Sequence, residues 1–236
     1  MGGLGEKIRL DDAGTVVHLT PVHQTIIDLI PEGTRVMDLG CGEGDLMLAL
    51  KVKKKVRAEG IELSEACIQA CVAKGLFNVH HGDLDEGLAD YPDKSVDFVI
   101  LTNTIQVLQR PMFLIREMVR VGKRCIVSFP NFAHWSVRWQ LFVRGRMPKT
   151  DHLPYEWYET QNIHLTTIDD FREFCRKAGL HVLQEVPLRT SRSGQHTGVR
   201  FLPNLLADSA IFVLEEGAAP RANSGAARSA PHGSSG

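Results

Sequence analysis

The sequence predicts an α/β protein built on a seven-stranded, mostly parallel sheet whose last two strands form an antiparallel hairpin. Three observations lead to this prediction. An apolar strand over Val36 to Leu39 runs directly into the glycine-rich loop 40–44, which opens a helix. The strand-then-helix pattern repeats along the chain. The segment 95–101 is almost continuously apolar, as expected of a parallel strand covered on both faces.

The composition favours a single large domain that works in the cytoplasm. The chain has 236 residues and a formal net charge of -1, so it can bury a substantial core and has no overall field to attract nucleic acid or an anionic membrane. Its five cysteines include no CxxC pair, which suits a reducing compartment. There is no secretion signal and no apolar run near the roughly 18 residues of a membrane span. We therefore expect no nucleic-acid or membrane partner.

The chain is expected to begin with a flexible arm over residues 1–19, which leads into a helix. Thr20 and Pro21 are residue types that favour an N-cap and a first helical position, and apolar residues follow at helical spacing. His23 and Gln24 lie on this helix. They either face a ligand site or lie in solvent.

The glycine loop has the spacing D-x-G-x-G-x-G, with Asp38 at the strand end and Gly40, Gly42 and Gly44 in the loop. Glycine lets a backbone lie close to a ligand, and the helix that begins at Asp45 points its positive end at the same place. The spacing differs from the G-x-G-x-x-G of dinucleotide folds. Asp38 would repel a pyrophosphate, but it suits the ammonium and sulfonium groups of S-adenosylmethionine. The alternative is a glycine turn without a ligand.

Glu62 closes the predicted second strand, 56–63, close to the interval of about 20 residues after which nucleotide-binding folds of this topology place an acidic group. There the carboxylate accepts the ribose hydroxyls, because its two oxygens match two vicinal donors. The alternative is an ordinary exposed glutamate at a strand end.

A short third strand over 77–80 follows a helix that Ser64 caps. His80, His81 and Asp83 could suggest a metal site. Adjacent strand residues point to opposite faces, however, and no third ligand is evident at helical spacing, so we expect no metal.

The remaining strands complete the domain, which we place at 20–216. Segment 124–129 is the fifth strand, and 181–186 and 210–214 are the antiparallel pair. Residues 217–236 are rich in Ala, Gly, Ser and Pro and are predicted to be disordered.

An aromatic and basic segment, 130–167, interrupts the strand-then-helix pattern. It contains all three tryptophans and several arginines. Such residues favour binding surfaces, and aromatics interleaved with basic groups could also hold single-stranded nucleic acid, a reading that the neutral chain disfavours. The segment is either a cover packed on its own sheet edge or a partner surface.

The glycine loop resembles the first motif of class I S-adenosylmethionine-dependent methyltransferases, which have a Rossmann-like fold. In that pattern an aspartate at the third strand end accepts from the adenine amino group and the next apolar residue packs on the ring. Asp83 and Leu84 match these positions. The expected binding set for S-adenosylmethionine or S-adenosylhomocysteine is Asp38, Gly40, Cys41, Gly42, Glu62, Leu63, Asp83, Leu84 and Asn103.

Three further segments look like the methionine biosynthesis protein MetW family. They are F-P-N-F at 129–132, R-G-R-M-P at 144–148 and L-P-Y-E-W-Y at 153–158, continuing to N-I-H-L at 162–165. Membership implies a role beside homoserine O-acyltransferase in methionine synthesis. The competing hypotheses are a methyltransferase acting on a small molecule and a scaffold with a decayed pocket.

The sequence assigns no catalytic base. Methyl transfer from a sulfonium depends mainly on alignment and desolvation, but an oxygen or nitrogen acceptor usually needs a base. The predicted fourth strand is followed by Asn103, Thr104 and Gln106, none of which takes a proton at neutral pH. His134, His152 and His164 in the aromatic segment are the candidates that remain, each against a structural role.

Overall fold

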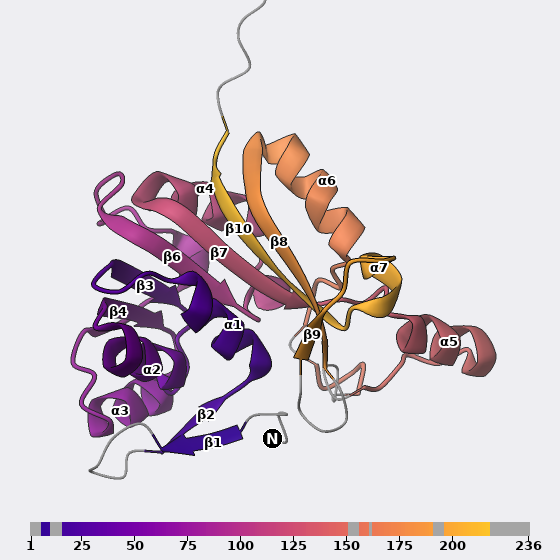
Figure 1. Ribbon diagram of the computed structural model, residues 1–236, viewed down its shortest axis with the longest axis horizontal. Coiled ribbons are helices and arrows are strands. Elements are labelled where there is room, and N and C mark those ends of the chain that lie inside the picture. The colour runs from indigo at the N-terminus through magenta and orange to yellow at the C-terminus, as the bar shows by residue number, and fades with distance from the viewer. Residues whose placement is uncertain (1–5, 10–15, 151–155, 161, 191–195, 218–236) are drawn as a thin grey trace, which may run out of the picture.

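Eight strands form one mixed sheet in the order β5-β4-β3-β6-β7-β10-β8-β9 (Figure 1). The computed structural model describes residues 6–9, 16–150, 156–160, 162–190 and 196–217. The first five strands of that order, from β5 at the edge to β7, are parallel. Strands β10, β8 and β9 each run antiparallel to their neighbours. The strands are β3 (Arg35–Leu39), β4 (Arg57–Glu62), β5 (Val79–His81), β6 (Val96–Thr102), β7 (Gly122–Pro130), β8 (Leu180–Thr190), β9 (His196–Gly198) and β10 (Ser209–Glu216).

Helices cover both faces of this sheet. One face carries α1 (Pro21–Leu29), α2 (Asp45–Lys54) and α3 (Glu65–Ala73), and the other carries α4 (Pro111–Val121) and α6 (Ile168–Ala178). Helix α5 (Trp135–Arg144) projects from the end of β7, and the short α7 (Pro203–Leu206) precedes β10. Two 3-10 turns, η1 (Leu84–Glu86) and η2 (Ile105–Val107), follow β5 and β6. None of the described helices has the length and apolar character needed to traverse a bilayer.

The core divides into two layers because strand side chains alternate between the faces. Met37 and Leu39 of β3 pack in the cluster with α4 and α6, whereas Val36 packs with α1 and α2. Asp38 therefore points toward the α1 and α2 layer, at the carboxyl end of β3 and directly before the glycine loop.

The predicted helix starts are confirmed. The Thr20 side chain accepts from the backbone N–H of His23 and Pro21 is the first residue of α1, while the Ser64 side chain accepts from the N–H of Cys67 at the start of α3. These local side-chain caps satisfy donors that a helix leaves unpaired.

The predicted count of seven strands is wrong, because the described part of the chain forms a sheet of eight. The additional strand is β9, whose residues pair with Leu188 to Thr190 of β8. It has three residues and lacks the apolar alternation that marks a strand in a sequence. The third strand is also displaced from its predicted range of 77–80, since β5 begins at Val79 and the side chain of Phe77 is 77% exposed.

The expected flexible arm over residues 1–19 needs correction where the structure describes it. Strands β1 (Glu6–Arg9) and β2 (Val16–Leu19) pair antiparallel as a separate two-stranded sheet. Val17 and Leu19 are buried in the layer with α1 and α2. Strand β2 has only four residues, and one of its two exposed positions is the apolar Val16, so the sequence carries little alternation to mark it. The predicted disordered tail lies outside the described residues from position 218 onward.

Candidate functional site

The glycine loop lies at the carboxyl ends of the parallel strands, and its three glycines have positive φ. The φ angles of Gly40, Gly42 and Gly44 are 70°, 55° and 79°, in the left-handed region that favours glycine. A Cβ atom on Gly40 would lie 2.8 Å from Oγ1 of Thr104, so the loop passes close to the end of β6. A Cβ atom on Gly42 would meet nothing within 4 Å. Gly42 therefore borders open space where a ligand can lie against the backbone.

Glu62 fastens the loop to the end of β4. Its Oε2 atom accepts from the backbone N–H of Gly42 at 2.8 Å, and its Oε1 atom accepts from the N–H groups of Leu63 and Ser64, each at 2.9 Å. The N–H of Gly40 also donates to the carbonyl of Ile61 at 2.8 Å. The carboxylate that was expected to bind a ribose is thus already part of the loop's hydrogen-bonded frame.

Helix α3 holds the loop from its other side. The Cys71 thiol donates to the carbonyl oxygen of Gly42 at 3.2 Å, and Nζ of Lys74 donates to the Glu43 carbonyl at 2.8 Å and to Oδ1 of Asp45 at 2.7 Å. Sequence reasoning missed Cys71 of α3 and Lys74, the residue that follows the helix, as loop supports. Asp45 is the first residue of α2, so Lys74 joins the loop to the helix that it opens.

Lys74→Ala is expected to lower the free energy of unfolding by about 1.5–3 kcal/mol, the usual range for hydrogen bonds to charged groups. The matched control is Lys177→Ala on α6. Its ion pair with Glu173 is exposed, with 62% of the lysine side chain accessible against 20% for Lys74, and exposed pairs contribute about 1 kcal/mol or less. Urea unfolding measures both variants. Equal losses would show that Lys74 does not brace the loop.

Asp38 is the most unusual group of the site. It is 3% exposed, and no side-chain or backbone donor among the described residues bonds its carboxylate. Burial raises the pKa of Asp38 from its ordinary 3.8 to about 7, and the negative charge of Glu62 adds to the effect. A buried carboxylate without a donor is costly when ionised. The position therefore suits a ligand that brings a positive charge and hydrogen-bond donors.

The other predicted binding residues gather at the same edge of the sheet. Leu63 follows β4 with 59% of its surface exposed, and Asn103 follows β6 with a φ of 52°. Asp83 is exposed and its Oδ1 atom accepts from the N–H of Asp85, while Leu84 is buried.

The Cys41 thiol is buried close to Gly60, where an added Cβ would lie 2.7 Å from the sulfur. Burial raises the pKa of this thiol far above its usual range, with the carboxyl of Asp38 as the next largest cause. Cys41 is therefore a neutral packing group beneath the loop.

Helix α1 places His23 and Gln24 in different surroundings. Burial lowers the pKa of His23 to about 4, partly offset by the carboxylate of Asp45 at the start of α2. Its imidazole is therefore neutral at pH 7, and its Nδ1 atom accepts from the backbone N–H of Thr20. Gln24 instead bonds the side chains of Asp28 and Lys53, so it lies toward the far end of α2.

A small cavity lies beyond Asn103, between η2 and the aromatic segment. It measures about 10 Å³, the space of one water molecule, and its lining includes Gln106, Phe132 and His164. Gln106 is buried, and its Oε1 atom has no hydrogen-bond partner among the residues that the structure describes. The backbone carbonyl of Gln106, by contrast, accepts from the N–H groups of Ile163 and His164.

The three histidines considered as bases therefore have different positions. His164 lines the cavity near the site, whereas His134 lies at the start of α5 with Nδ1 2.7 Å from Oγ of Ser136. His152 lies outside the described residues. Across the described ranges, no three His, Cys, Asp or Glu side chains come together as metal ligands.

Comparison with known sequences identifies a family model described as methionine biosynthesis protein MetW, which matches residues 21–214. The bifunctional methionine biosynthesis protein MetXA/MetW of Rhodopirellula baltica is 32% identical over 200 residues, covering 81% of this chain and 32% of that protein. Ajmaline N-methyltransferase of Rauvolfia serpentina is 33% identical over 92 residues, which cover 37% of this chain and 32% of that enzyme. The chain thus spans about a third of the length of these curated relatives.

Solved structures confirm the Rossmann-like methyltransferase fold. A Thermotoga maritima SAM-dependent methyltransferase, described as a possible histamine N-methyltransferase, has a TM-score of 0.61 and 19% identity, with 83% of this chain and 87% of that chain covered. Magnesium protoporphyrin IX methyltransferase of Synechocystis with bound SAH has a TM-score of 0.55 and 17% identity, with 83% and 80% covered. At such identities the likeness concerns the fold alone.

Proposed function

The chain belongs to the MetW family of methionine biosynthesis proteins, and we propose that it binds S-adenosylmethionine or S-adenosylhomocysteine and acts with homoserine O-acyltransferase. The observation that carries the binding proposal is the buried Asp38 carboxylate, which has no donor from the described residues and stands beside the open space at Gly42. Both ligands carry an ammonium group. Its charge and its N–H donors would supply what this carboxylate lacks.

The remaining residues support an adenosyl ligand along the same edge. A carboxylate has about four lone-pair sites, and three on Glu62 are used by backbone N–H groups. We propose that the fourth, on Oε2, accepts one ribose hydroxyl rather than both. Asp83 and Leu84 are proposed to hold the adenine as the family pattern implies, with exposed Leu63 on its other face.

The affinity for S-adenosylhomocysteine should rise with pH between 5.5 and 8. Because the ligand-free pKa of Asp38 is about 7, the carboxyl is protonated below that pH and cannot pair with an ammonium group. Binding to the ionised form then releases one proton, so the dissociation constant should fall about tenfold per pH unit below pH 7 and level off above it. Equilibrium binding across the range, with Asp38→Asn as the comparison, checks this. An equally steep pH dependence in Asp38→Asn would assign the proton to another group.

The partner proposal has independent support from the bifunctional relative. One Rhodopirellula baltica chain carries both MetXA and MetW names, and this chain matches about a third of its length. Two activities joined in one polypeptide often correspond to separate proteins that associate, since the linker only raises their effective concentration. Co-purification of this protein with the homoserine O-acyltransferase of the same organism tests the association.

A second candidate function is methyl transfer to a small molecule. It is favoured by the cavity at the same sheet edge, where the unpartnered amide oxygen of Gln106 lies beside His164. An acceptor would have to displace the segment that narrows this cavity. Conversion of S-adenosylmethionine to S-adenosylhomocysteine with a small-metabolite extract, lost in His164→Gln, would favour this function over the first.

A further inference from the structure

Helix α5 carries large apolar side chains that the rest of the described chain leaves exposed. Val137 is its one buried residue. Figure 1 shows the helix projecting from the end of β7, away from both helical layers. The exposed fractions are 47% for Trp135, 60% for Trp139, 44% for Leu141, 84% for Phe142 and 57% for Val143.

This distribution of apolar side chains is typical of a buried helix rather than of a helix at the protein surface. A surface helix usually confines its apolar residues to one stripe facing its own core. Here Trp135, Trp139 and Phe142 lie outside the core, and Trp139 and Phe142 contact each other with ring centroids 6.2 Å apart. Clustered exposed aromatics of this kind mark contact sites for another macromolecule. For α5 these exposed fractions favour a partner surface over an internal cover, although Asn131 and Ala133 before it are buried.

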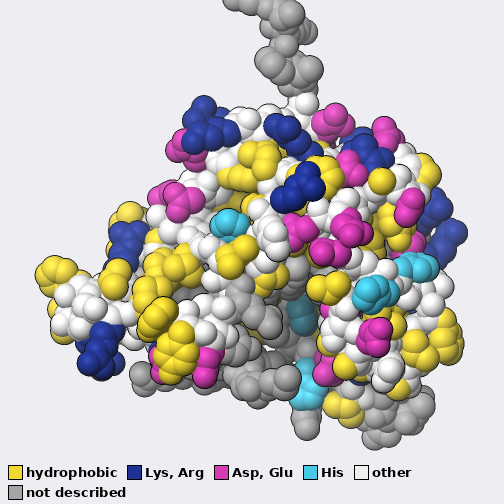
Figure 2. All heavy atoms as spheres, turned by 180° about the vertical axis from the view of Figure 1, so that it is seen from behind, with side chains coloured by type: hydrophobic (Ala, Val, Ile, Leu, Met, Phe, Trp, Pro, Cys, Tyr) yellow, Lys and Arg dark blue, Asp and Glu magenta, His cyan; other side chains and the backbone are white. Residues whose placement is uncertain are grey.

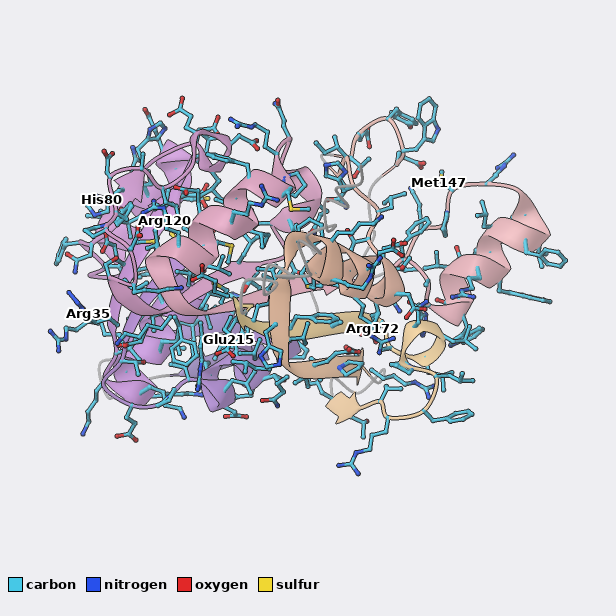
Figure 3. All side chains as sticks on the ribbon, turned by 90° about the horizontal axis from the view of Figure 1, so that it is seen from above. Arg35, His80, Arg120, Met147, Arg172 and Glu215 are labelled. Atoms are coloured by element: carbon cyan, nitrogen blue, oxygen red, sulfur yellow. The ribbon has the colours of Figure 1, made fainter. Side chains whose placement is uncertain are left out.

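Basic groups border this apolar helix. The sequence of α5 contains no acidic residue, and the structure's described parts offer no carboxylate partner to Arg138, Arg144 or Arg146. Arg144 and Arg146 line a cleft of about 680 Å³ with Trp157, which is 71% exposed. The one carboxylate among the described lining residues, that of Glu156, is paired with Lys149, so the two arginines are not neutralised by it. Figure 2 shows hydrophobic and basic side chains gathered on this projecting lobe, and Met147, labelled in Figure 3, lies on the chain between α5 and the Trp157 loop.

The arginines on and beside α5 distinguish between the binding partners that could cover this surface. A second copy of the chain would bring the arginines of two α5 helices together, and like charges at an interface are unfavourable. A partner with an apolar groove flanked by acidic side chains would neutralise them. Arginine and tryptophan are also the residue types that most often dominate binding energy at protein interfaces.

We propose that α5 together with the cleft at Arg144, Arg146 and Trp157, here termed the α5 surface, is the docking site for homoserine O-acyltransferase. This inference rests on the proposed function, which supplies the partner. The acyltransferase would present an acidic-rimmed apolar groove to the helix. Because α5 follows the carboxyl end of β7, the partner would sit at the same sheet edge as the glycine loop.

The test measures binding of the purified acyltransferase to the full chain by calorimetry. Trp139→Ala and Phe142→Ala together should weaken association by at least about a hundredfold, and Arg144→Glu by at least tenfold, since each central anchor contributes about 2 kcal/mol. The matched control is Phe77→Ala with Val72→Ala, two apolar residues that are 77% and 47% exposed on and after α3, at the opposite end of the sheet from α7. It should bind like the unmutated chain. Melting temperature and S-adenosylhomocysteine affinity should be unchanged in all variants.

Each outcome decides a different claim. If the unmutated chain does not bind the acyltransferase, the proposed partnership itself fails. If it binds and the α5 variants bind equally well, the α5 surface is not the docking site. Light scattering provides the third outcome: a dimer that Trp139→Ala with Phe142→Ala dissociates, while acyltransferase binding persists, would make a second copy the occupant and overturn the proposal.

Discussion

Gly42→Val is expected to reduce the affinity for S-adenosylhomocysteine by at least a factor on the order of a hundred while the protein stays folded. Residue 42 has a φ of 55°, and its missing Cβ faces open space. Valine would fill that space and would be strained in the left-handed region, at a cost of roughly 1–2 kcal/mol. A hundredfold loss corresponds to about 2.7 kcal/mol of binding free energy. Calorimetric titration measures the loss of ligand affinity, and a thermal melt measures the cost of the backbone strain.

The matched control is Gly33→Val, at the opposite end of β3. Gly33 has a φ of 72° and also nothing within 4 Å of an added Cβ. The substitution therefore imposes similar backbone strain without touching the glycine loop. It should lower the melting temperature about as much as Gly42→Val and leave ligand affinity unchanged. A comparable loss of affinity in Gly33→Val would mean that strain, and not filled space, accounts for the effect.

Asp38→Asn should make the ligand-free protein more stable and make ligand binding weaker. The folded pKa of about 7 exceeds the ordinary 3.8, so the folded state favours the protonated carboxyl. The free energy of unfolding therefore falls as pH rises from about 4 to 7, and the full cost of ionisation remains above pH 7. The difference between the folded pKa and the ordinary pKa corresponds to a loss of about 4 kcal/mol in the free energy of unfolding. Replacing the carboxylate by a neutral amide should recover much of it at pH 8, raising the melting temperature by about 10 °C.

Asp97→Asn is the control with the opposite sign. Asp97 accepts from the N–H of Arg35 and from Nζ of Lys123, and these bonds lower its pKa, the Arg35 bond most. Its substitution should therefore destabilise the protein at pH 8. Melting curves at pH 5 and pH 8 compare the two variants. If Asp38→Asn also destabilises the protein at pH 8, the Asp38 carboxylate is stabilised in the folded state and is not costly to ionise.

The glycine loop and the succession of strands and helices could be predicted because their signals are local. Asp38 and the glycines are neighbours in the sequence, and Glu62 follows at the interval that one strand-helix-strand unit requires. The caps at Thr20 and Ser64 depend on residues three positions away. In each of these cases the residue type alone indicates its backbone role.

The supports of the loop could not be predicted, because they depend on tertiary contacts. Lys74 bonds Asp45 across 29 residues of sequence, and Cys71 bonds the Gly42 carbonyl over the same separation. Neither residue type marks such a role. The sequence also indicated an acidic group at Asp38, but only the three-dimensional surroundings reveal that it has no donor from the described residues.

The aromatic segment shows the same limit. Its composition indicated either a cover or a partner surface, and amino-acid types cannot distinguish the two, because both require tryptophan and phenylalanine. The structure separates them by exposure. Phe142 is 84% exposed on α5, whereas Asn131 is buried and bonds the carbonyl of Ala207 beside the sheet.

Calorimetric titration of S-adenosylhomocysteine into protein freed of any carried-over ligand tests the central claim most directly. We expect one site per chain and, at pH 7, the release of about half a proton per ligand bound, because a carboxyl with a pKa of about 7 is already half ionised there. This release appears as a heat that depends on the ionisation enthalpy of the buffer. In Asp38→Asn, we expect ligand binding to release no proton from this position. No binding heat in several buffers, together with a melting temperature that the ligand leaves unchanged, would contradict the account.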